Sequence, residues 1–163
     1  MLLIGGFTVF GIILISFVFI GEKKAVEKLD QVAYYQSTDA QKPIATFSPE
    51  FKDIGKMNVS DERSADFTVT NTGTKPLSFF NISSSCGCTV GVVTIKGARS
   101  PEGFMHAKGS WVGTLVPGDT ATVTVIYRPS IMPVKGDISR SVYVETNDPA
   151  NKQLTFTIKA FVE

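Results

Sequence analysis

The sequence predicts an all-β protein, an immunoglobulin-like β-sandwich of about seven to nine strands preceded by one N-terminal transmembrane helix. Three observations support this prediction. From residue 44 onward, apolar and polar residues alternate in short runs, as in strands that bury one face. Turn-forming residues separate these runs at regular intervals, which is typical of a sandwich. Residues 2–20 carry no charge, and about 20 apolar residues are needed to cross a bilayer as a helix.

The uncharged N-terminal stretch has two interpretations. A secretory signal peptide would need a basic segment before it and a small-residue cleavage site after Ile20, and the sequence has neither. We therefore expect a retained transmembrane helix over residues 1–21. Its membrane-spanning side chains are large and apolar, and include Leu2, Phe7, Phe10, Ile13, Phe17 and Ile20.

Residues 22–42 are predicted to form a stalk that is partly helical. Apolar residues recur at helical spacing between residues 25 and 33, so the helix is expected to continue to about Tyr35. The following residues, 36–43, are polar and rich in turn formers, as in a linker. Tyr34 and Tyr35 are candidates either for the membrane interface or for contact with a partner protein.

The predicted sandwich occupies residues 43–163. Nine runs have strand character: 44–48, 56–59, 65–71, 77–82, 89–95, 111–115, 120–127, 139–146 and 154–162. The last run is the clearest, because Leu154, Phe156 and Ile158 share one face and threonines share the other. The run 120–127 has a similar apolar stripe. We expect both stripes to lie in the core.

Four short motifs separate these runs: Asn71-Thr72-Gly73, Ser85-Cys86-Gly87-Cys88-Thr89, Pro117-Gly118 and Asn147-Asp148-Pro149. Their order along residues 44–163 resembles that of the bacterial DUF1573 proteins. The resemblance implies an immunoglobulin-like sandwich that is exported and often anchored to a membrane. It implies little about activity.

Two signals conflict on topology. Lys23, Lys24 and Lys28 follow the predicted helix and nothing basic precedes it, which by the positive-inside tendency would place the sandwich in the cytoplasm. The DUF1573 resemblance implies the opposite side. Following the resemblance, we expect a single-pass protein of the inner (cytoplasmic) membrane with its sandwich on the periplasmic side.

The connection between Cys88 and Trp111 is longer than the family pattern implies and is rich in glycine. Long loops in compact domains tend to be functional or disordered. We expect residues 96–110 to be mobile when free and to become ordered against a partner. Phe104 and Trp111 are candidate partner contacts, and Trp111 has a core position in the sandwich as its alternative role.

Three interpretations remain open for Cys86 and Cys88, the only cysteines of the chain. They are buried structural residues, or a Cys-x-Cys disulfide that the short ring makes easy to reduce. In the third interpretation, Cys86 and Cys88 are two thiolate ligands for a soft ion such as Cu(I), together with Met105 or His106.

Other chemistry is poorly represented in the sequence. His106 is the single histidine, and no phosphate-binding glycine loop, zinc-ligand spacing or paired-carboxylate motif is present. The net charge is +1, and no basic stripe suggests nucleic acid. We expect no enzymatic activity, no cofactor and no nucleic-acid partner.

These features predict a non-catalytic accessory or assembly subunit. Its exported sandwich would dock on a larger membrane protein complex, of respiratory or photosynthetic type for example, so its partners would be other membrane subunits and the lipid bilayer. The alternative function is a thiol-redox or copper-handling module that uses Cys86 and Cys88.

Overall fold

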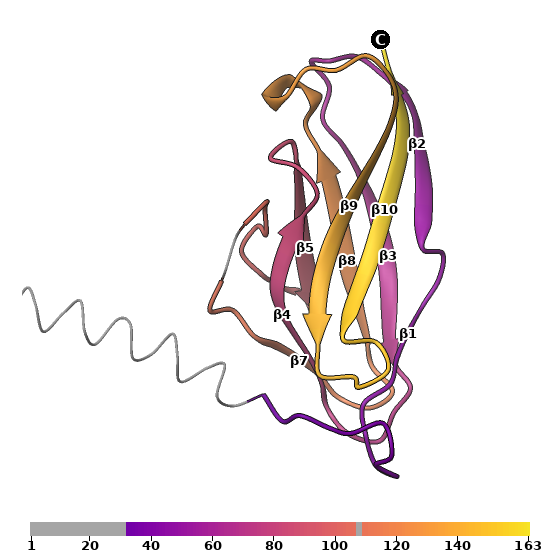
Figure 1. The fold of residues 1–163 in the computed structure, drawn as a ribbon, viewed down its shortest axis with the longest axis vertical. Coiled ribbons are helices and arrows are strands. Elements are labelled where there is room, and N and C mark those ends of the chain that lie inside the picture. Colours follow the sequence, from indigo (N-terminus) through magenta and orange to yellow (C-terminus); the bar gives the residue numbers. More distant parts are fainter. Residues whose placement is uncertain (1–31, 107–108) are drawn as a thin grey trace, which may run out of the picture. The chain divides into compact units, whose positions relative to one another are not determined.

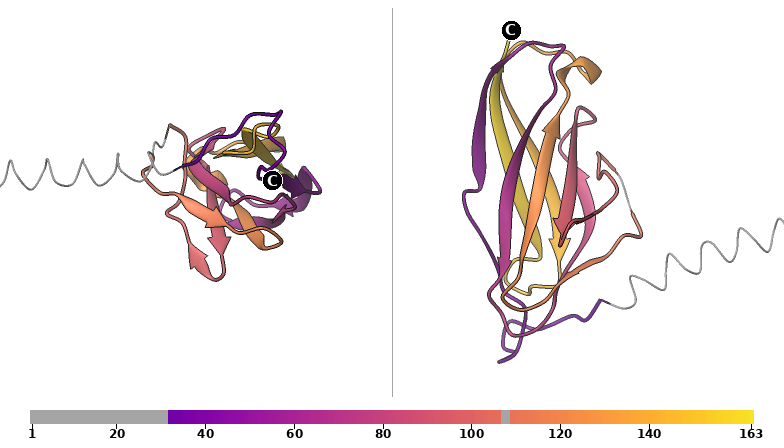
Figure 2. Two further views of the ribbon diagram at one scale, coloured as in Figure 1. Left: turned by 90° about the horizontal axis from the view of Figure 1, so that it is seen from below. Right: turned by 180° about the vertical axis from the view of Figure 1, so that it is seen from behind.

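The computed structural model describes residues 32–106 and 109–163, which form ten strands in two facing sheets and one short 3-10 helix (Figures 1 and 2). The predicted β-sandwich is therefore confirmed, with ten strands where the sequence predicted about seven to nine. The predicted transmembrane helix, with Leu2, Phe7, Phe10, Ile13, Phe17 and Ile20, lies outside the described residues. Within the described residues, no helix has the length and apolar character that a membrane span requires.

Each sheet has five strands. The first contains, in spatial order, β1 (Ala45–Phe47), β3 (Arg63–Asn71), β8 (Thr120–Tyr127), β5 (Thr89–Ile95) and β6 (Ala98–Arg99). The second contains β2 (Phe51–Met57), β10 (Gln153–Val162), β9 (Gly136–Thr146), β4 (Leu77–Ser84) and β7 (Gly113–Leu115). All neighbours are antiparallel except β2, which runs parallel to β10. The 3-10 helix η1 (Pro129–Ile131) lies in the connection from β8 to β9.

The chain changes sheets between β1 and β2, at the cis peptide bond Ser48–Pro49. The sequence predicted the second strand only from residue 56, whereas β2 begins at Phe51. The reason is a bulge in its register against β10, where Gly55 has φ of +75°. A bulge interrupts strict alternation, so the period-2 pattern used for prediction is lost there.

The core fills the space between the two inner faces. Leu154, Phe156 and Ile158 are fully buried, as predicted, and so are the alternate residues of β8. Phe156 of the second sheet contacts two rings of the first, with centroids 5.2 Å from that of Phe47 and 5.3 Å from that of Phe67. Tilted aromatic pairs of this kind add stability beyond their buried area.

The segment before β1 corrects one expectation. Residues 32–44 contain turns and irregular structure but no helix, so the helix predicted to reach Tyr35 is not found there. The backbone of this segment is instead bonded to the sandwich: Asn147 Nδ2 donates to the carbonyl oxygen of Ala33 over 2.9 Å, and Thr74 N donates to that of Lys42 over 3.0 Å. These tertiary hydrogen bonds override the weak helical periodicity.

The connection from β5 to β7 corrects a second expectation. Lys96 and Gly97 form a tight turn with positive φ, and β6 then pairs back onto β5. Gly103 and Gly91 exchange two backbone hydrogen bonds of 2.8 Å. A Cβ atom on Gly103 would lie 2.4 Å from the carbonyl oxygen of Ile82. Residues 96–103 are thus ordered by the sandwich itself, and no partner is needed to order them.

Candidate functional site

Three of the four sequence motifs meet at one end of the sandwich. Figure 1 shows the connections after β3, after β7 and after β9 gathered at this end, while the connection from β4 to β5 lies toward the other. The backbone of Asn71 exchanges hydrogen bonds with Gly118 and Asp119, and Ser78 N donates to the Asn147 side chain over 2.8 Å. We call this the motif end, and we call the end with Cys86 and Cys88 the disulfide end.

The buried polar residues of the motif end have structural roles. The Asn71 side chain donates to the carbonyl oxygens of Lys75 and Leu115 and accepts from Gly73 N. Asp148, 1% exposed, accepts from Ala45 N over 2.9 Å. These side chains hold the loops together through the hydrogen bonds that buried polar groups in native proteins usually make.

Asn147 connects the motif end to the segment that precedes β1. Its Oδ1 accepts from Ser78 N, and its Nδ2 donates to the carbonyl oxygens of Ala33 and Pro76. The bond to Ala33 fixes the residue directly before Tyr34. The two tyrosines that the sequence singled out are therefore held against the sandwich by a motif residue.

Tyr34 and Tyr35 line an open groove of about 440 Å³. The other walls come from β4 and from the end of β9 with its following loop, and include Phe80, Glu145, Asp148 and Lys152. Tyr34 is 72% exposed. We call this feature the tyrosine groove. It combines aromatic surface with carboxylate, amide and ammonium groups, a mixture suited to binding a polypeptide.

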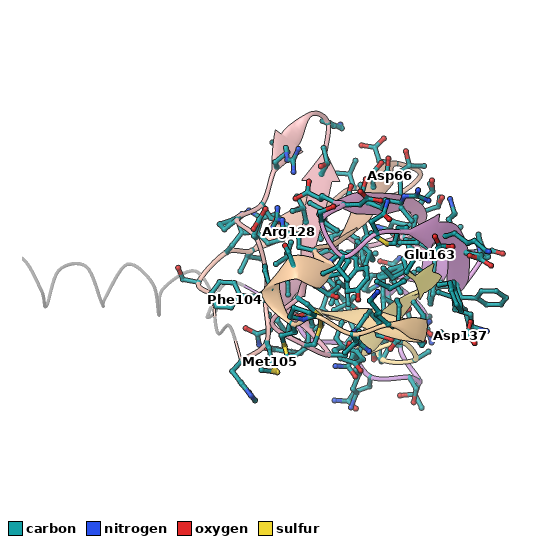
Figure 3. The ribbon with its side chains drawn as sticks, turned by 90° about the horizontal axis from the view of Figure 1, so that it is seen from above. Asp66, Phe104, Met105, Arg128, Asp137 and Glu163 are labelled. Atoms are coloured by element: carbon teal, nitrogen blue, oxygen red, sulfur yellow. A yellow bond between two sulfur atoms is a disulfide. The ribbon has the colours of Figure 1, made fainter. Side chains whose placement is uncertain are left out.

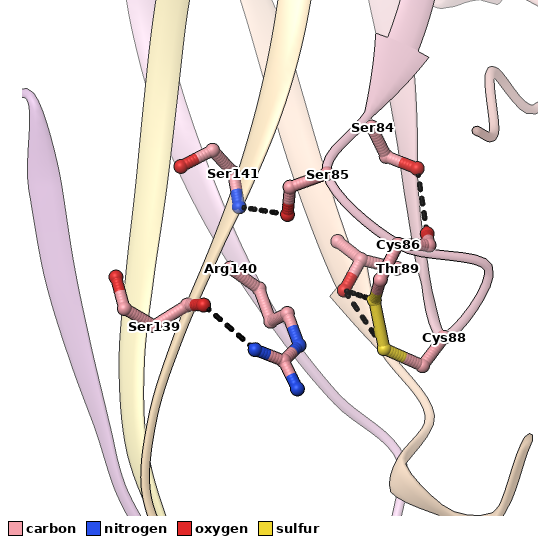
Figure 4. Close-up of a disulfide and its surroundings, with 8 residues drawn as sticks. All are labelled: Ser84, Ser85, Cys86, Cys88, Thr89, Ser139, Arg140 and Ser141. Carbon is pink, nitrogen blue, oxygen red and sulfur yellow. Dashed lines mark hydrogen bonds between the residues drawn. A yellow bond between two sulfur atoms is a disulfide. The ribbon is translucent and has the colours of Figure 1, made fainter. Parts of the chain in front are cut away.

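At the disulfide end, Cys86 and Cys88 form a disulfide, the state required by the redox interpretation (Figure 4). Both are also buried, at 8% and 1% exposure, as the structural interpretation requires. The Thr89 hydroxyl lies 3.4 Å from the Cys86 sulfur and 3.8 Å from that of Cys88. Disulfide sulfurs carry no proton, so Thr89 is the donor.

The copper interpretation finds no assembled site. While the disulfide is formed, neither sulfur is a thiolate ligand. Met105 and His106 line a different groove with Ser83, Tyr143 and Glu145. Within residues 32–106 and 109–163, no three His, Cys, Asp or Glu side chains are grouped to hold a metal ion.

The remaining candidate contacts do not line the tyrosine groove. Phe104 and Met105 are exposed on the outside of the sandwich (Figure 3). Trp111 is partly buried and packs against the core, where its ring leaves no room for a Cβ on Gly113. Trp111 thus lies at the margin of the core, close to the role in the sandwich that the sequence also allowed. No described contact joins it to the two tyrosines.

One charged cluster has no signal in the sequence. Arg128 forms a bidentate pair with Glu102, at 3.0 and 3.1 Å, and its Nε donates to Glu62 over 2.5 Å. The hydrogen bond from Arg128 lowers the pKa of Glu102, and the two carboxylates raise the pKa of Arg128. The cluster ties the β5–β7 connection to β8. Its members come from three separate segments, which no local pattern relates.

A second missed residue has a readable signal. Arg140 occupies the inward-facing series of β9, between Ile138 and Val142. Its guanidinium carbon lies 5.9 Å from the ring centre of Tyr127, and Figure 4 shows Arg140 among the surroundings of the disulfide. A cation on the apolar face of a predicted strand is unusual and could have been noticed in the sequence.

Comparison with known proteins gives a family and a fold. The sequence model for the HYDIN/CFA65/VesB-like Ig-like domain matches residues 43–161. No curated protein matches the chain significantly.

Solved structures share the fold at low identity. A protein of unknown function from Porphyromonas gingivalis W83 is 17% identical with a TM-score of 0.56, over 76% of this chain and 49% of that one. A family 123 glycoside hydrolase from Clostridium perfringens is 14% identical with a TM-score of 0.50, over 71% of this chain and 23% of that one. PapD-like domain 7 of human CEP192 is 13% identical with a TM-score of 0.48, over 80% and 98%. This chain therefore spans about half of the first protein and about a quarter of the second.

Proposed function

The chain belongs to the HYDIN/CFA65/VesB-like family of Ig-like domains, and from this premise we propose that it is a non-catalytic binding module. It docks on a subunit of a membrane protein complex, and the tyrosine groove is the docking surface. The partner contributes a polypeptide segment that covers Tyr34 and Tyr35. The transmembrane helix expected over residues 1–21 places the module at the membrane.

The observation that carries this proposal is that a segment with two tyrosines, of which Tyr34 is exposed and Tyr35 half-buried, is bonded to the sandwich next to an open groove. Tyrosine offers a large contact area for the loss of few side-chain rotations, and it is enriched at protein interfaces. Ordering a segment against a partner costs conformational entropy. Here the hydrogen bond from Asn147 to Ala33 already orders the backbone next to the tyrosines in the unbound protein, so less conformational entropy is lost on binding. A pre-ordered aromatic surface of this kind favours tight binding.

The shape and lining of the groove favour a polypeptide over a small metabolite. Small-molecule sites are concave and enclose most of the ligand, with few polar groups among apolar walls. The tyrosine groove is open, and Glu145 and Lys152 bring charges of both signs to its lining. These groups match the polar rim of a protein interface.

Two further considerations support a membrane-bound, exported module. The DUF1573 resemblance implies export, and the sequence places Tyr34 only a short segment after the apolar stretch 2–20. A partner within the same membrane would present its own extramembrane segments at a comparable distance from the bilayer.

Co-purification from a mild detergent tests the proposal with the full-length chain. We expect wild-type protein to retain a membrane subunit that the double variant Tyr34→Ser, Tyr35→Ser loses. The matched control is Phe51→Ser with Phe161→Ser, which removes two exposed rings from the β2–β10 edge. Retention of the same partner by both variants would contradict the proposal.

A further inference from the structure

We propose that Cys86 and Cys88 form a thiol–disulfide exchange centre, in which Arg140 stabilises the thiolate released when a protein dithiol reduces the bond. This goes beyond docking, because it assigns a chemical activity to the opposite end of the sandwich. The inference depends on the surroundings of the disulfide and on the exposed surface next to it.

The guanidinium of Arg140 has few hydrogen-bond partners among the described residues. It lies on the inward-facing side of β9, and its Nε is buried without a hydrogen-bond partner among the described residues. One hydrogen bond joins its Nη1 to the carbonyl oxygen of Ser139 over 3.0 Å. No described carboxylate lies within salt-bridge distance of it. A partly buried guanidinium with unsatisfied donors has a strong affinity for an anion.

Tyr127 adds a second unsatisfied donor at the same place. Its side chain is fully buried, and its hydroxyl has no partner among the described residues. Tyr127 faces the Arg140 guanidinium and pairs directly with Thr89 in the β5–β8 ladder. Buried polar groups without partners are rare in native proteins and call for an explanation, such as a redox or catalytic role.

The anion that these groups lack appears when the disulfide opens. Figure 4 draws Arg140 and Thr89 on the same side of the disulfide, and the Thr89 hydroxyl already reaches both sulfurs. A cation and a hydroxyl donor next to a sulfur lower the pKa of its thiol. Two other guanidinium groups of this end already have partners: Arg128 pairs with Glu62 and Glu102, and Arg63, opposite Tyr127 in the β3–β8 ladder, donates to the carbonyl oxygen of Ile54. Arg140, whose buried Nε has no described partner, is therefore the cation that we assign to the thiolate.

The exchange balances with a dithiol as the reductant. A thiolate of the dithiol attacks the sulfur of Cys86, which is the more exposed of the two, and the bond to Cys88 breaks. The electron pair leaves on Cys88 as a thiolate. The mixed disulfide joins the reductant to Cys86. The second thiol of the reductant then attacks the reductant's sulfur in this bond, and Cys86 is released. Two electrons and two protons pass from the dithiol to the cysteine pair, and the reductant leaves as a disulfide.

A surface for such a partner lies next to the disulfide. Ile131, Met132 and Val134, in the connection from β8 to β9, are all exposed. A Cβ atom built on Gly87, between the cysteines, would lie 3.9 Å from the sulfur of Met132. A run of exposed apolar residues at a reactive bond is suited to a dithiol oxidoreductase, which must place its own thiolate against that bond.

Two measurements on the full-length protein in mild detergent test the proposal. The first equilibrates it with buffers of reduced and oxidised dithiothreitol or glutathione and counts thiols with a thiol-reactive polyethylene glycol. The second follows the rate at which iodoacetamide alkylates the reduced protein as a function of pH. We expect native-state reduction, and an alkylation midpoint below the value of about 8.5 for an ordinary cysteine.

Variants of Arg140 separate this role from a purely structural one. Arg140→Gln should raise the alkylation midpoint by about one pH unit and lower the equilibrium constant for reduction about fivefold at pH 8.5. Arg140→Lys, which keeps the charge, should remain closer to wild type. The control Arg99→Gln removes an exposed guanidinium from β6 and should change neither quantity. Reduction only in denaturant, or a wild-type midpoint at or above about 8.5, would overturn the proposal whatever the variants do.

Discussion

Asn147 and Ala33 are joined by a hydrogen bond of 2.9 Å that crosses 114 positions of the sequence. It connects the last of the four motifs to the first residues of the described sandwich unit. Its consequence is that Tyr34 and Tyr35 belong to a defined surface. Without it, they would lie on a segment that has no secondary structure of its own.

Replacing Asn147 by Ala should destabilise the sandwich by about 1–3 kcal/mol, because Ser78 N and the Ala33 and Pro76 carbonyl oxygens lose their partner. Urea unfolding measures the loss. Limited proteolysis should show new cleavage within residues 33–42. Asn58→Ala, at an exposed position, is the matched control and should remain within about 0.5 kcal/mol of wild type. Equal unfolding free energies and equal cleavage patterns for the two variants would mean that Asn147 does not hold the segment 33–42 against the sandwich.

Replacing Phe156 by Ala should cost about 3–5 kcal/mol, because a fully buried ring that contacts Phe47 and Phe67 leaves a cavity between the sheets. Against a typical domain stability of about 5–15 kcal/mol, the variant would accumulate poorly. Thr155→Ala, an exposed neighbour on the same strand, should be near neutral in the same unfolding experiment. Comparable losses in both would contradict the register of β10.

The alternation of apolar residues predicted most of this fold. The runs 89–95 and 120–127 coincide with β5 and β8, and the buried face of β10 was identified residue by residue. The pattern failed where the backbone departs from a regular strand. Gly55 breaks the alternation in β2, and the two residues of β6 are too few to show a period.

The candidate sites were predictable only in part. Tyr34 and Tyr35 could be selected from the sequence because they are aromatic residues outside the predicted sandwich. The groove beside them depends on Asn147, which lies far along the chain. The cysteine pair was evident, yet its relation to Tyr127 depends on which strands pair. Contacts between distant segments depend on the topology of the fold, and local sequence patterns do not predict them.

The long β5–β7 connection provides a test of close backbone packing. Gly103→Ala should be destabilising, because its Cβ would lie 2.4 Å from the Ile82 carbonyl oxygen and must push the loop away from β4. We expect a loss of about 1–3 kcal/mol. Gly109→Ala, whose Cβ would meet no described atom closer than Trp111 N at 3.9 Å, should be neutral in thermal unfolding. A neutral Gly103→Ala would mean that residues 96–103 do not pack as described.

The Arg128–Glu102 pair should give a pH-dependent contribution to stability. The folded-state pKa of Glu102 is lowered from 4.5 by Arg128, so its contribution is present above pH 4.5 and is lost as the pH falls through the folded-state value. The carboxylate is partly exposed, so we expect only about 0.2–1 kcal/mol.

Unfolding of wild type and Glu102→Gln at several pH values measures this contribution. The two proteins should differ at pH 7 and converge at low pH. Glu50→Gln, an exposed carboxylate with no described salt bridge, serves as the control and should show no such convergence. A difference that persists unchanged well below pH 4.5 would contradict a role for the charge of Glu102.

Site-specific photo-crosslinking tests the docking surface most directly. A photoreactive phenylalanine analogue replaces Tyr34 in the full-length protein, and in a second sample it replaces Phe161 on the β2–β10 edge. After irradiation of intact membranes, we predict one discrete crosslinked membrane protein from position 34 and none from position 161. The same partner from both positions, or no crosslink from position 34 in membranes that contain the protein at normal levels, would contradict docking through the tyrosine groove.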